Sequence, residues 1–416
     1  MRRVVITGAG TVNPLAGDLP GTLDAMRRGD VAIGPLDIAD VDRLAIRIGA
    51  QVRNWDVASR FPPAEAVMLD RATALAVAAA DEAVARAGLR ILPAEAPRAG
   101  VILGTAGGGL ATAEDAYRSV LVGGRDRVHP FTVPRLMHNA AAAQLSIRHG
   151  LKGPALTVAT ACAASNHAMG LALHMIRAGM ADVVLTGGAD AMLTFGGIKA
   201  WEGLRVMSPD GCRPFCQSRN GFVMGEGAAI LVFEEASRAL GRGAPVLAEV
   251  AGFGMTADAG DIVQPSAEGA ARAMAAALDD AGLAPGEIGY INAHGTGTRA
   301  NDRAESEAIL AVFGKAAAGI PVSSTKSLHG HLVGAAGAVE ILACLLALGE
   351  GIVAPTAGFR RPDPECAIDV VVHAARPARV GAALSNAFAF GGLNAVLALR
   401  RLQDGKGGTG MPPVSG

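Results

Sequence analysis

Aromatic and charged residues are scarce in this chain of 416 residues, making up 4% and 18% of it. Platforms that bind nucleic acid rely on exposed aromatic and basic groups, so nucleic acid is not an expected partner. The formal net charge is −1 and there is no long basic run, which disfavours binding to a membrane surface. Hydrophobic residues make up 50% of the chain, so a large buried core is predicted.

Cysteine is also scarce. The five cysteines, at positions 162, 212, 216, 344 and 366, form no regular framework, and their odd number predicts free thiols in a reducing compartment. Cys212 and Cys216 have CxxxC spacing, but no second pair or histidine cluster accompanies them, so no metal site is expected. No secretory signal precedes the first strand-like run, and the most apolar helical stretch, 335–348, is interrupted by Glu340 and short for a bilayer. We therefore expect a cytoplasmic protein without membrane insertion.

Several motifs of common enzyme classes are missing. There is no G-x-S-x-G, so the turn that carries the nucleophile of many serine hydrolases is absent. Gly8-Ala9-Gly10 begins like a dinucleotide fingerprint, but Asn13 occupies the place of the third glycine. The glycine-rich segment 104–109 lacks the Lys-Ser/Thr of a phosphate-binding loop. Both glycine clusters are interpreted as tight turns.

Units of similar sequence occur in the same order in two parts of the chain. Each part has an apolar strand, an Ala-rich helix ending in Ala-Gly-Leu, a second strand, a strand that turns sharply into a helix, and a closing strand. In the first part the first strand is 4–10, the Ala-rich helix ends at residue 89 and the second strand is 100–105. The strand that turns into a helix is 156–178 and the closing strand is 228–234. In the second part the first strand is 248–254, the Ala-rich helix ends at residue 283 and the second strand is 289–296. The strand that turns into a helix is 322–348 and the closing strand is 395–400.

This alternation of helices and strands predicts an α/β fold with mostly parallel sheets covered by helices. We expect two tandem halves, 1–240 and 241–402, the first with extra sequence around 107–150. The Gly-rich and Pro-rich end, 403–416, is predicted to be a flexible tail.

Cys162 is a candidate nucleophile. It lies among small residues where an apolar strand turns into a helix, and the free N–H groups of a helix start favour thiolate over thiol. The alternative is a buried structural cysteine, which is the commoner role of a lone cysteine.

Two histidines of the second half are candidates for the same site. His294 follows an apolar strand, and the ends of parallel strands are where α/β proteins place reactive groups. His331 lies at the second half's strand-to-helix turn, the counterpart of the Cys162 turn. His329 competes with His331 for this role, and each histidine could instead be an ordinary loop residue bonded to backbone.

Four segments together resemble the elongating β-ketoacyl-acyl carrier protein synthases of the thiolase-like superfamily. They are Thr160-Ala161-Cys162-Ala163-Ala164-Ser165, Asn292 to Thr298 (NAHGTGT), Ser324-Thr325-Lys326-Ser327 with Gly330-His331, and Ser385 to Gly392 (SNAFAFGG). The resemblance runs from Val4 to about Leu402. It implies a thiolase-like fold whose two halves form a layered α-β-α-β-α core. It also implies decarboxylative Claisen condensation of a cysteine-bound acyl group with malonyl-acyl carrier protein.

The resemblance also implies roles for individual residues. Cys162 would be acylated, with the N–H groups of Cys162 and Phe390 holding the oxyanion. His294 and His331 would donate hydrogen bonds to the malonyl thioester carbonyl, and a neighbouring cation, Lys326, would keep them neutral.

Further roles concern the substrate. Glu305 would pair with Lys326. Thr296 and Thr298 would bind the phosphopantetheine arm, which arrives on the carrier protein, so no separate cofactor is expected. Phe388 and Phe390 would lie beside the acyl pocket, with Phe390 as a gate, and Gly107 stands where many relatives have a bulky residue near the acyl tunnel. A homodimer is expected from the family and from the 107–150 insertion.

Some features depart from the usual sequence pattern of this family, and several related protein types are possible alternatives. Ala389 replaces the usual glycine between the two phenylalanines. The segments 199–205 and 210–215 look more like nodulation-type synthases. A non-catalytic subunit of the chain-length-factor type would share the fold, but such subunits usually lack the cysteine. A degradative thiolase would need a second cysteine near the chain end in a Cys-x-Gly setting, and an initiating synthase would have asparagine in place of one histidine.

Overall fold

A ten-stranded sheet forms the framework of the protein in the computed structural model, which describes residues 1–402. The strand order is β10-β9-β13-β14-β8-β1-β7-β6-β4-β5. In chain order these are β1 (Val4–Val12), β4 (Ala99–Gly104), β5 (Ala155–Val158), β6 (Val183–Asp190), β7 (Gly227–Glu235), β8 (Ala248–Ala257), β9 (Ile288–Asn292), β10 (Val322–Ser323), β13 (Ala382–Ala389) and β14 (Leu393–Arg400).

The order is symmetrical about the contact between β1 and β8. Each half places, from this contact outward, its first strand, its last strand and then the three strands between them. β1 and β8 pair only through Val5 with Glu249 and Ile6 with Ala248, so two five-stranded halves are joined by a short antiparallel contact. The repeated order of units in the sequence therefore corresponds to two similar α/β halves, which confirms this part of the predicted fold. The expectation of mostly parallel pairing is wrong, because the closing strands β7 and β14 run antiparallel to both of their neighbours and β1 runs antiparallel to β8.

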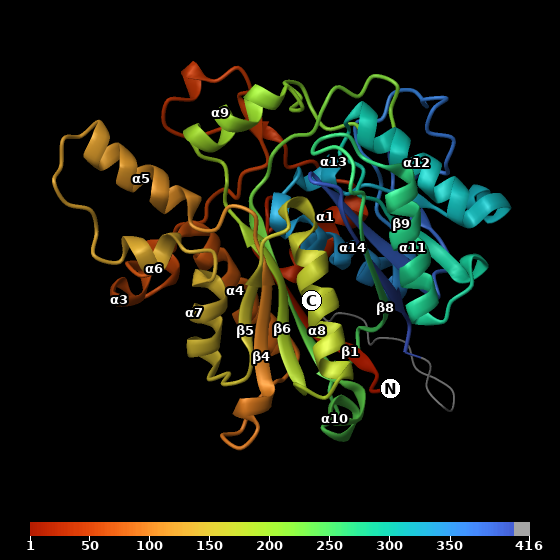
Figure 1. Cartoon of the computed structure of the whole chain (residues 1–416), viewed down its shortest axis with the longest axis horizontal. Coiled ribbons are helices and arrows are strands. Elements are labelled where there is room, and N and C mark those ends of the chain that lie inside the picture. The colour runs from red at the N-terminus through yellow and green to blue at the C-terminus, as the bar shows by residue number, and fades with distance from the viewer. Residues whose placement is uncertain (403–416) are drawn as a thin grey trace.

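Helices form three layers around these strands (Figure 1). α4 (Arg71–Arg86) and α7 (Ala140–His149) cover the outer face of the first half. α11 (Ala267–Ala281), with α12 (Arg299–Phe313) beside it, covers the outer face of the second. α8 (Ala164–Arg177) and α14 (Ala336–Glu350) lie between the halves and contact strands of both. This is the layered α-β-α-β-α core that the resemblance implied.

Glycine in the strands and alanine in the helices allow the layers to approach closely. A Cβ atom added at Gly8 of β1 would lie 2.3 Å from the carbonyl oxygen of Ala83 in α4. The second half repeats the arrangement, because a Cβ at Gly252 of β8 would lie 2.5 Å from the carbonyl oxygen of Ala277 in α11. Close packing of small residues explains why so large a core needs few aromatic side chains.

Apart from Glu340 and its last residue, Glu350, the central helix α14 is apolar on all sides. Every residue from Ala336 to Leu348 is buried, as expected of a helix enclosed on all sides. The stretch Val333–Glu350 is long and apolar enough to cross a membrane, but 89% of it is buried inside the fold. It is therefore a core helix between the two halves of the sheet.

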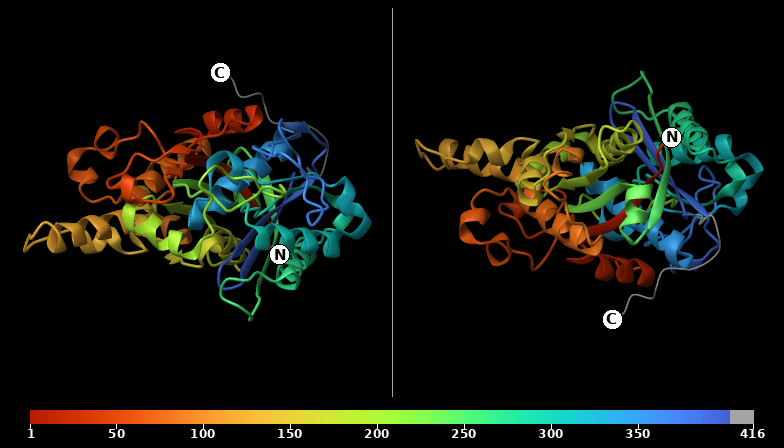
Figure 2. Two further views of the ribbon diagram at one scale, coloured as in Figure 1. Left: turned by 90° about the horizontal axis from the view of Figure 1, so that it is seen from above. Right: turned by 90° about the horizontal axis from the view of Figure 1, so that it is seen from below.

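The segment 107–150 holds α5 (Leu110–Leu121), α6 (Thr132–Leu136) and α7, and α5 projects away from the body (Figure 2). The remaining helices have ten residues or fewer and the remaining strands have two. They are α1 (Leu19–Arg28), α2 (Val57–Arg60), α3 (Pro63–Ala66), α9 (Phe195–Leu204), α10 (Ala236–Gly241), α13 (Lys326–His329) and the pairs β2 (Gly34–Pro35) with β3 (Ile48–Gly49) and β11 (Ile352–Val353) with β12 (Arg376–Pro377). The predicted tail, 403–416, lies outside the described residues.

Candidate active site

One cavity, of about 160 Å³, brings together candidate residues from both halves of the chain. Cys162 comes from the turn between β5 and α8, His294 from the segment after β9, and His331 from the segment between α13 and α14. The other predicted residues that line it are Thr296, Thr298, Phe388 and Phe390. The three remaining predicted residues, Gly107, Glu305 and Lys326, do not line it.

Cys162 lies in a short 3-10 turn, Ala161–Ala163, that leads directly into α8. Ala161 has a φ of 47°, which a residue with a Cβ rarely adopts, so the chain turns sharply just before the sulfur. Burial raises the pKa of the Cys162 thiol to about 12, outweighing the Lys326 charge and the N–H groups of Cys162 and Phe390, which lower it. The N–H groups at the helix start therefore favour the thiolate, as expected, but desolvation of the buried sulfur has the larger effect on its pKa.

The two imidazoles face each other edge to face across the cavity. Their ring centroids are 5.5 Å apart with an interplanar angle of 83°, and the residues are 3% and 1% exposed. Burial, reinforced by the Lys326 charge, lowers the pKa of both His294 and His331 well below the usual histidine value, so both are neutral at pH 7. Within residues 1–402, neither ring nitrogen of His331 has a hydrogen-bond partner. His331 can therefore offer a donor to a ligand without breaking a bond.

His329, the competitor of His331, is already engaged elsewhere. Its Nδ1 lies 2.8 Å from the Gly330 carbonyl oxygen and its Nε2 lies 3.0 Å from Thr325 Oγ1. It is fully buried and does not line the cavity. Its position explains why two histidines so close in sequence have different surroundings.

The predicted pairing of Lys326 with Glu305 is wrong. Lys326 Nζ donates to Glu340 Oε1 in α14, and both side chains are completely buried. Glu305 instead accepts hydrogen bonds from the backbone N–H groups of His294, at 2.8 Å, and Gly295, at 2.7 Å. A buried charge needs a partner, and Glu340 is the carboxylate that the α14 backbone brings to Lys326. Glu305 thus fixes the backbone that carries His294.

The predicted substrate-binding residues fall into two groups. Thr296 and Thr298 lie in the cavity wall with their hydroxyl oxygens 2.9 Å apart. Gly107 lies outside the cavity, where its N–H donates to Asp190 Oδ1 and where a Cβ would come within 2.7 Å of Met192 Cγ. The Met192 side chain thus occupies the space that the absent Gly107 side chain leaves.

Two aromatic residues that the sequence interpretation did not select also line the cavity. Trp201 stacks on Phe390, with ring centroids 5.7 Å apart and an interplanar angle of 27°. Phe222 packs edge-on against both Trp201 and His331, each at 5.3 Å. The chain has only two tryptophans, and this rarity was the available signal for Trp201. These rings make the cavity largely apolar, which suits an acyl chain.

Comparisons with known proteins agree with this geometry. The family models described as β-ketoacyl synthase N-terminal domain and C-terminal domain match residues 1–239 and 247–360. The chain is 48% identical over 404 residues to nodulation protein E of Rhizobium sp. (strain N33), covering 96% of this chain and all of that protein. It is 40% identical over 409 residues to 3-oxoacyl-[acyl-carrier-protein] synthase 2 of Staphylococcus aureus (strain COL), covering 97% and 99%.

The fold comparison gives the same result. The solved structure entitled "The ishigamide ketosynthase/chain length factor" matches with a TM-score of 0.91 at 35% identity, covering 97% of this chain and all of that one. The chain therefore belongs to the β-ketoacyl synthase family, with a thiolase-like ketosynthase fold. It is a condensing enzyme of the acyltransferase class.

Proposed function

We propose that this chain transfers an acyl group to Cys162 and condenses it with malonyl-acyl carrier protein. In the first half-reaction the Cys162 sulfur attacks an acyl thioester, the carrier thiolate leaves, and the proton of Cys162 passes to it. In the second, malonyl thioester loses CO2, and the electron pair of the broken C–C bond forms an enolate. The enolate carbon attacks the acyl carbonyl, and the Cys162 thiolate leaves, giving β-ketoacyl-acyl carrier protein.

His294 and His331 act in this proposal as a pair of donors to the enolate oxygen. The observation that carries the proposal is that two neutral, buried imidazoles share a cavity with the buried thiol. A neutral imidazole presents one N–H, and His331 has both ring nitrogens unengaged within the described residues. Donors fixed in advance in a dry cavity stabilise a developing negative charge without reorganisation.

Lys326 contributes through its charge. It lies outside the cavity, bound to Glu340, and lowers the pKa of His294, His331 and Cys162. The same cation thus disfavours imidazolium and favours the thiolate that must leave in the second half-reaction.

The remaining cavity residues form two groups, one for the phosphopantetheine arm and one for the acyl chain. The adjacent hydroxyls of Thr296 and Thr298 hydrogen-bond the amides of the phosphopantetheine arm. Phe388, Phe390 and the newly found Trp201 surround the acyl chain, and the N–H groups of Cys162 and Phe390 stabilise the oxyanion.

Carrier docking is proposed at the mouth of this cavity. Arg205 is exposed and precedes Val206, which lines the cavity. Arg71 is a poorer candidate, because its guanidinium is held by the buried carboxylate of Glu226. In the part of the chain that the structure describes, Arg205 makes no ion pair, so an acidic carrier would approach its charge more readily than the neutralised charge of Arg71.

A homodimer is proposed through the edge of the first half. β5 ends the sheet and therefore has an unpaired edge within the described residues. Next to it, the 107–150 segment exposes large apolar side chains, with Tyr117, Leu121 and Val122 at 64%, 80% and 83%. A second copy would cover both features. Sedimentation velocity of the double variant Leu121→Asp, Val122→Asp tests this, with a monomer expected where the unchanged protein is dimeric.

The five cysteines are all free and buried, as suits a reducing compartment, and we propose a cytoplasmic location.

The direct test is product formation from purified acyl-carrier and malonyl-carrier thioesters. The proposal predicts β-ketoacyl-carrier and one CO2 per turnover. A protein that binds these thioesters but forms neither an acyl adduct at Cys162 nor product would instead be a non-catalytic partner subunit of the chain-length-factor type.

A further inference from the structure

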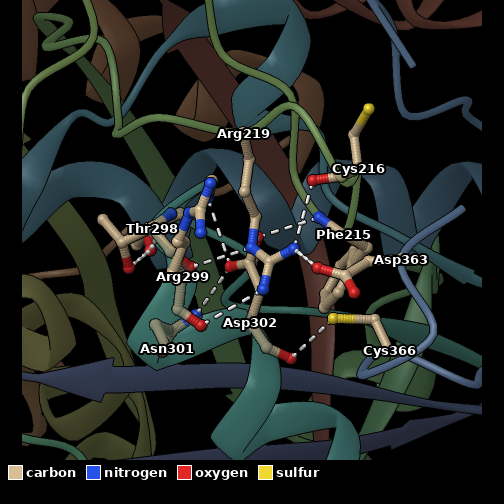
Figure 3. A network of polar contacts seen from close by, with 12 residues as sticks. Phe215, Cys216, Arg219, Thr298, Arg299, Asn301, Asp302, Asp363 and Cys366 are labelled. Carbon is tan, nitrogen blue, oxygen red and sulfur yellow. Dashed lines mark hydrogen bonds and ion pairs between the residues drawn. The ribbon is translucent and has the colours of Figure 1, made fainter. Parts of the chain in front are cut away.

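A second polar cluster adjoins Thr298, which lines the cavity, and the start of α12 (Figure 3). Its centre is Arg219, whose side chain is only 1% exposed. The guanidinium pairs with two carboxylates, with Nε 3.5 Å from Asp302 Oδ2 and Nη1 bound to Asp363 Oδ2. Burying a charged guanidinium is costly unless several hydrogen-bond acceptors surround it. The acceptors around Arg219 therefore show which parts of the backbone it holds in place.

Arg219 also donates to three backbone carbonyl groups. Nε lies 3.3 Å from the Thr298 oxygen, Nη2 3.3 Å from the Arg299 oxygen, and Nη1 3.1 Å from the Cys216 oxygen. Two of these contacts fall on consecutive residues at the start of α12, whose first turn also lines the cavity through Ala300 and Asn301. The planar fork of the guanidinium allows one side chain to hold both carbonyls at once.

Asp302 holds the same turn from the other side. From the first turn of α12, its Oδ1 accepts from the Gly297 N–H at 3.2 Å, and its Oδ2 accepts from the Phe215 N–H at 2.8 Å. The Gly297 carbonyl accepts from the Gly221 N–H at 2.9 Å, and Gly297 has a φ of 79°. The peptide groups on both sides of Gly297 are therefore tied to the 215–221 segment.

We propose that Arg219 is a positioning residue that sets the two threonine hydroxyls for the substrate arm. This inference rests on the proposed function of Thr296 and Thr298. Arg219 does not itself line the cavity and acts through the backbone of the 296–299 turn. Arg219 also donates to the Asp363 carboxylate, so it fixes the position of the 296–299 turn relative to the 359–366 segment as well as to α12.

The ligand class that this arrangement selects is a chain of amides attached to a thioester. The hydroxyl oxygens of Thr296 and Thr298 lie 2.9 Å apart, so both can bind neighbouring amide groups of the arm only if the backbone between them is fixed. A small displacement of this backbone would misalign both hydrogen bonds to the arm. Loss of the Arg219 fork should therefore weaken binding of the arm without changing the reacting groups.

The test compares four variants in the intact protein: Arg219→Lys, Thr298→Val, the double variant, and Arg177→Lys. Arg177 is the matched control, because it is also a mostly buried arginine bound to a carboxylate, Asp280, and a carbonyl, Ala251, at the opposite end of α8 from Cys162. With malonyl-carrier as the varied substrate, Arg219→Lys should raise KM about tenfold and leave kcat within about twofold. Arg177→Lys should change neither.

The double variant separates positioning from a general loss of stability. If Arg219 acts through the threonine turn, Arg219→Lys raises the KM of Thr298→Val by much less than the tenfold expected in the unchanged protein, because only the Thr296 hydroxyl remains to be misplaced. The rate of Cys162 alkylation by iodoacetamide stays unchanged in both single variants. An unchanged KM in Arg219→Lys, multiplicative effects in the double variant, or an equal effect of Arg177→Lys would overturn the inference. If Arg219→Lys does not fold, Asp363→Asn should give a smaller rise in KM through the same turn, and an unchanged KM there would overturn it.

These outcomes remain distinct from failure of the proposed function. If the unchanged protein forms no product, the proposed function is overturned. If it forms product and Arg219→Lys has the same KM, only the positioning role of Arg219 is overturned.

Discussion

The two halves of the molecule make the same strand-to-helix turn and use it differently. In the first half β5 leads through the 3-10 turn at Ala161 into α8, and in the second a 3-10 turn at Val333 leads into α14. Ala161 and Val333 have φ values of 47° and 50°, so both turns share an unusual backbone. The next residue is Cys162 in the first half and Gly334 in the second. The backbone has thus been repeated, but the reactive group has not.

The second turn serves as packing for the first half. The Gly334 N–H donates to Asp190 Oδ2 at 2.6 Å, and Asp190 also accepts from Thr105, Ala106 and Gly107 at the ends of the first-half strands. The second half contributes His294, His331 and Lys326 instead of a nucleophile. The comparison teaches that neither half contains the site, which exists only because the halves pack together.

Replacing the sulfur should have the largest effect on activity and little effect on the fold. Cys162→Ala removes one atom from a residue that is 6% exposed, and the small neighbours accommodate alanine. We expect no measurable condensation, with an unfolding midpoint close to that of the unchanged protein. Steady-state product assays and denaturant unfolding measure the two quantities. Retained condensation would show that the nucleophile lies elsewhere.

The matching change in the second turn should do the reverse. A Cβ at Gly334 would lie 2.5 Å from both Ala106 N and Asp190 Oδ2, so Gly334→Ala must shift packed backbone. We expect a loss of about 1–3 kcal/mol in the free energy of unfolding, as for other overpacked sites. Denaturant unfolding checks this. A Gly334→Ala protein of unchanged stability would contradict the packing role of the second turn.

Loss of either second-half imidazole should stop the second half-reaction and spare the first. His294→Ala or His331→Ala should lower the rate of condensation by about 10²–10³, the range seen when a donor to an oxyanion is removed. Rapid-quench measurement separates acyl transfer to Cys162 from product formation. Condensation at the normal rate in either variant would refute the donor pair.

The two carboxylates of the second half should differ in their effect on stability. Glu340→Gln leaves Lys326 as a buried charge without its partner and should cost about 3–5 kcal/mol. Glu305→Gln keeps an amide oxygen for the N–H groups of His294 and Gly295, so it should cost about 1–2 kcal/mol. Denaturant unfolding of both variants gives the comparison, and a greater loss in Glu305→Gln would reinstate the pairing of Lys326 with Glu305.

The pH dependence of Cys162 alkylation reports on the first half's turn without catalysis. Because burial raises the pKa of Cys162 to about 12, the thiolate fraction is small at neutral pH and increases as pH rises. Alkylation of Cys162 by iodoacetamide should therefore accelerate about tenfold per pH unit between about pH 7 and 10, with no plateau. Lys326→Met should slow it at each pH, since the cation lowers this pKa. A plateau near pH 7 would show that the helix start outweighs burial.

The repeat made the fold predictable from sequence, because both halves use the same spacing of strands, Ala-rich helices and turns. Local sequence also marked Cys162 and His294, since each follows a strand and lies among small residues. These signals reflect backbone geometry, which nearby residues largely determine.

What the sequence could not provide were contacts between distant segments. Glu340 was noted only as an interruption of an apolar helix, although a charge in that setting requires a buried partner. The helix start at Cys162 suggested a thiolate, but the size of the desolvation effect depends on the opposite half of the molecule. Gly107 was expected beside the acyl pocket, and Met192, 85 residues further along the chain, occupies that space instead.

Intact-protein mass spectrometry after incubation with an acyl-carrier thioester tests the shared site most directly. The account predicts one acyl adduct, mapped to Cys162, in the unchanged protein and in both histidine variants, and none in Cys162→Ala. Addition of malonyl-carrier should then discharge the adduct only in the unchanged protein. An adduct on another residue, or discharge in a histidine variant, would contradict the claim that one sulfur and two imidazoles from opposite halves act together.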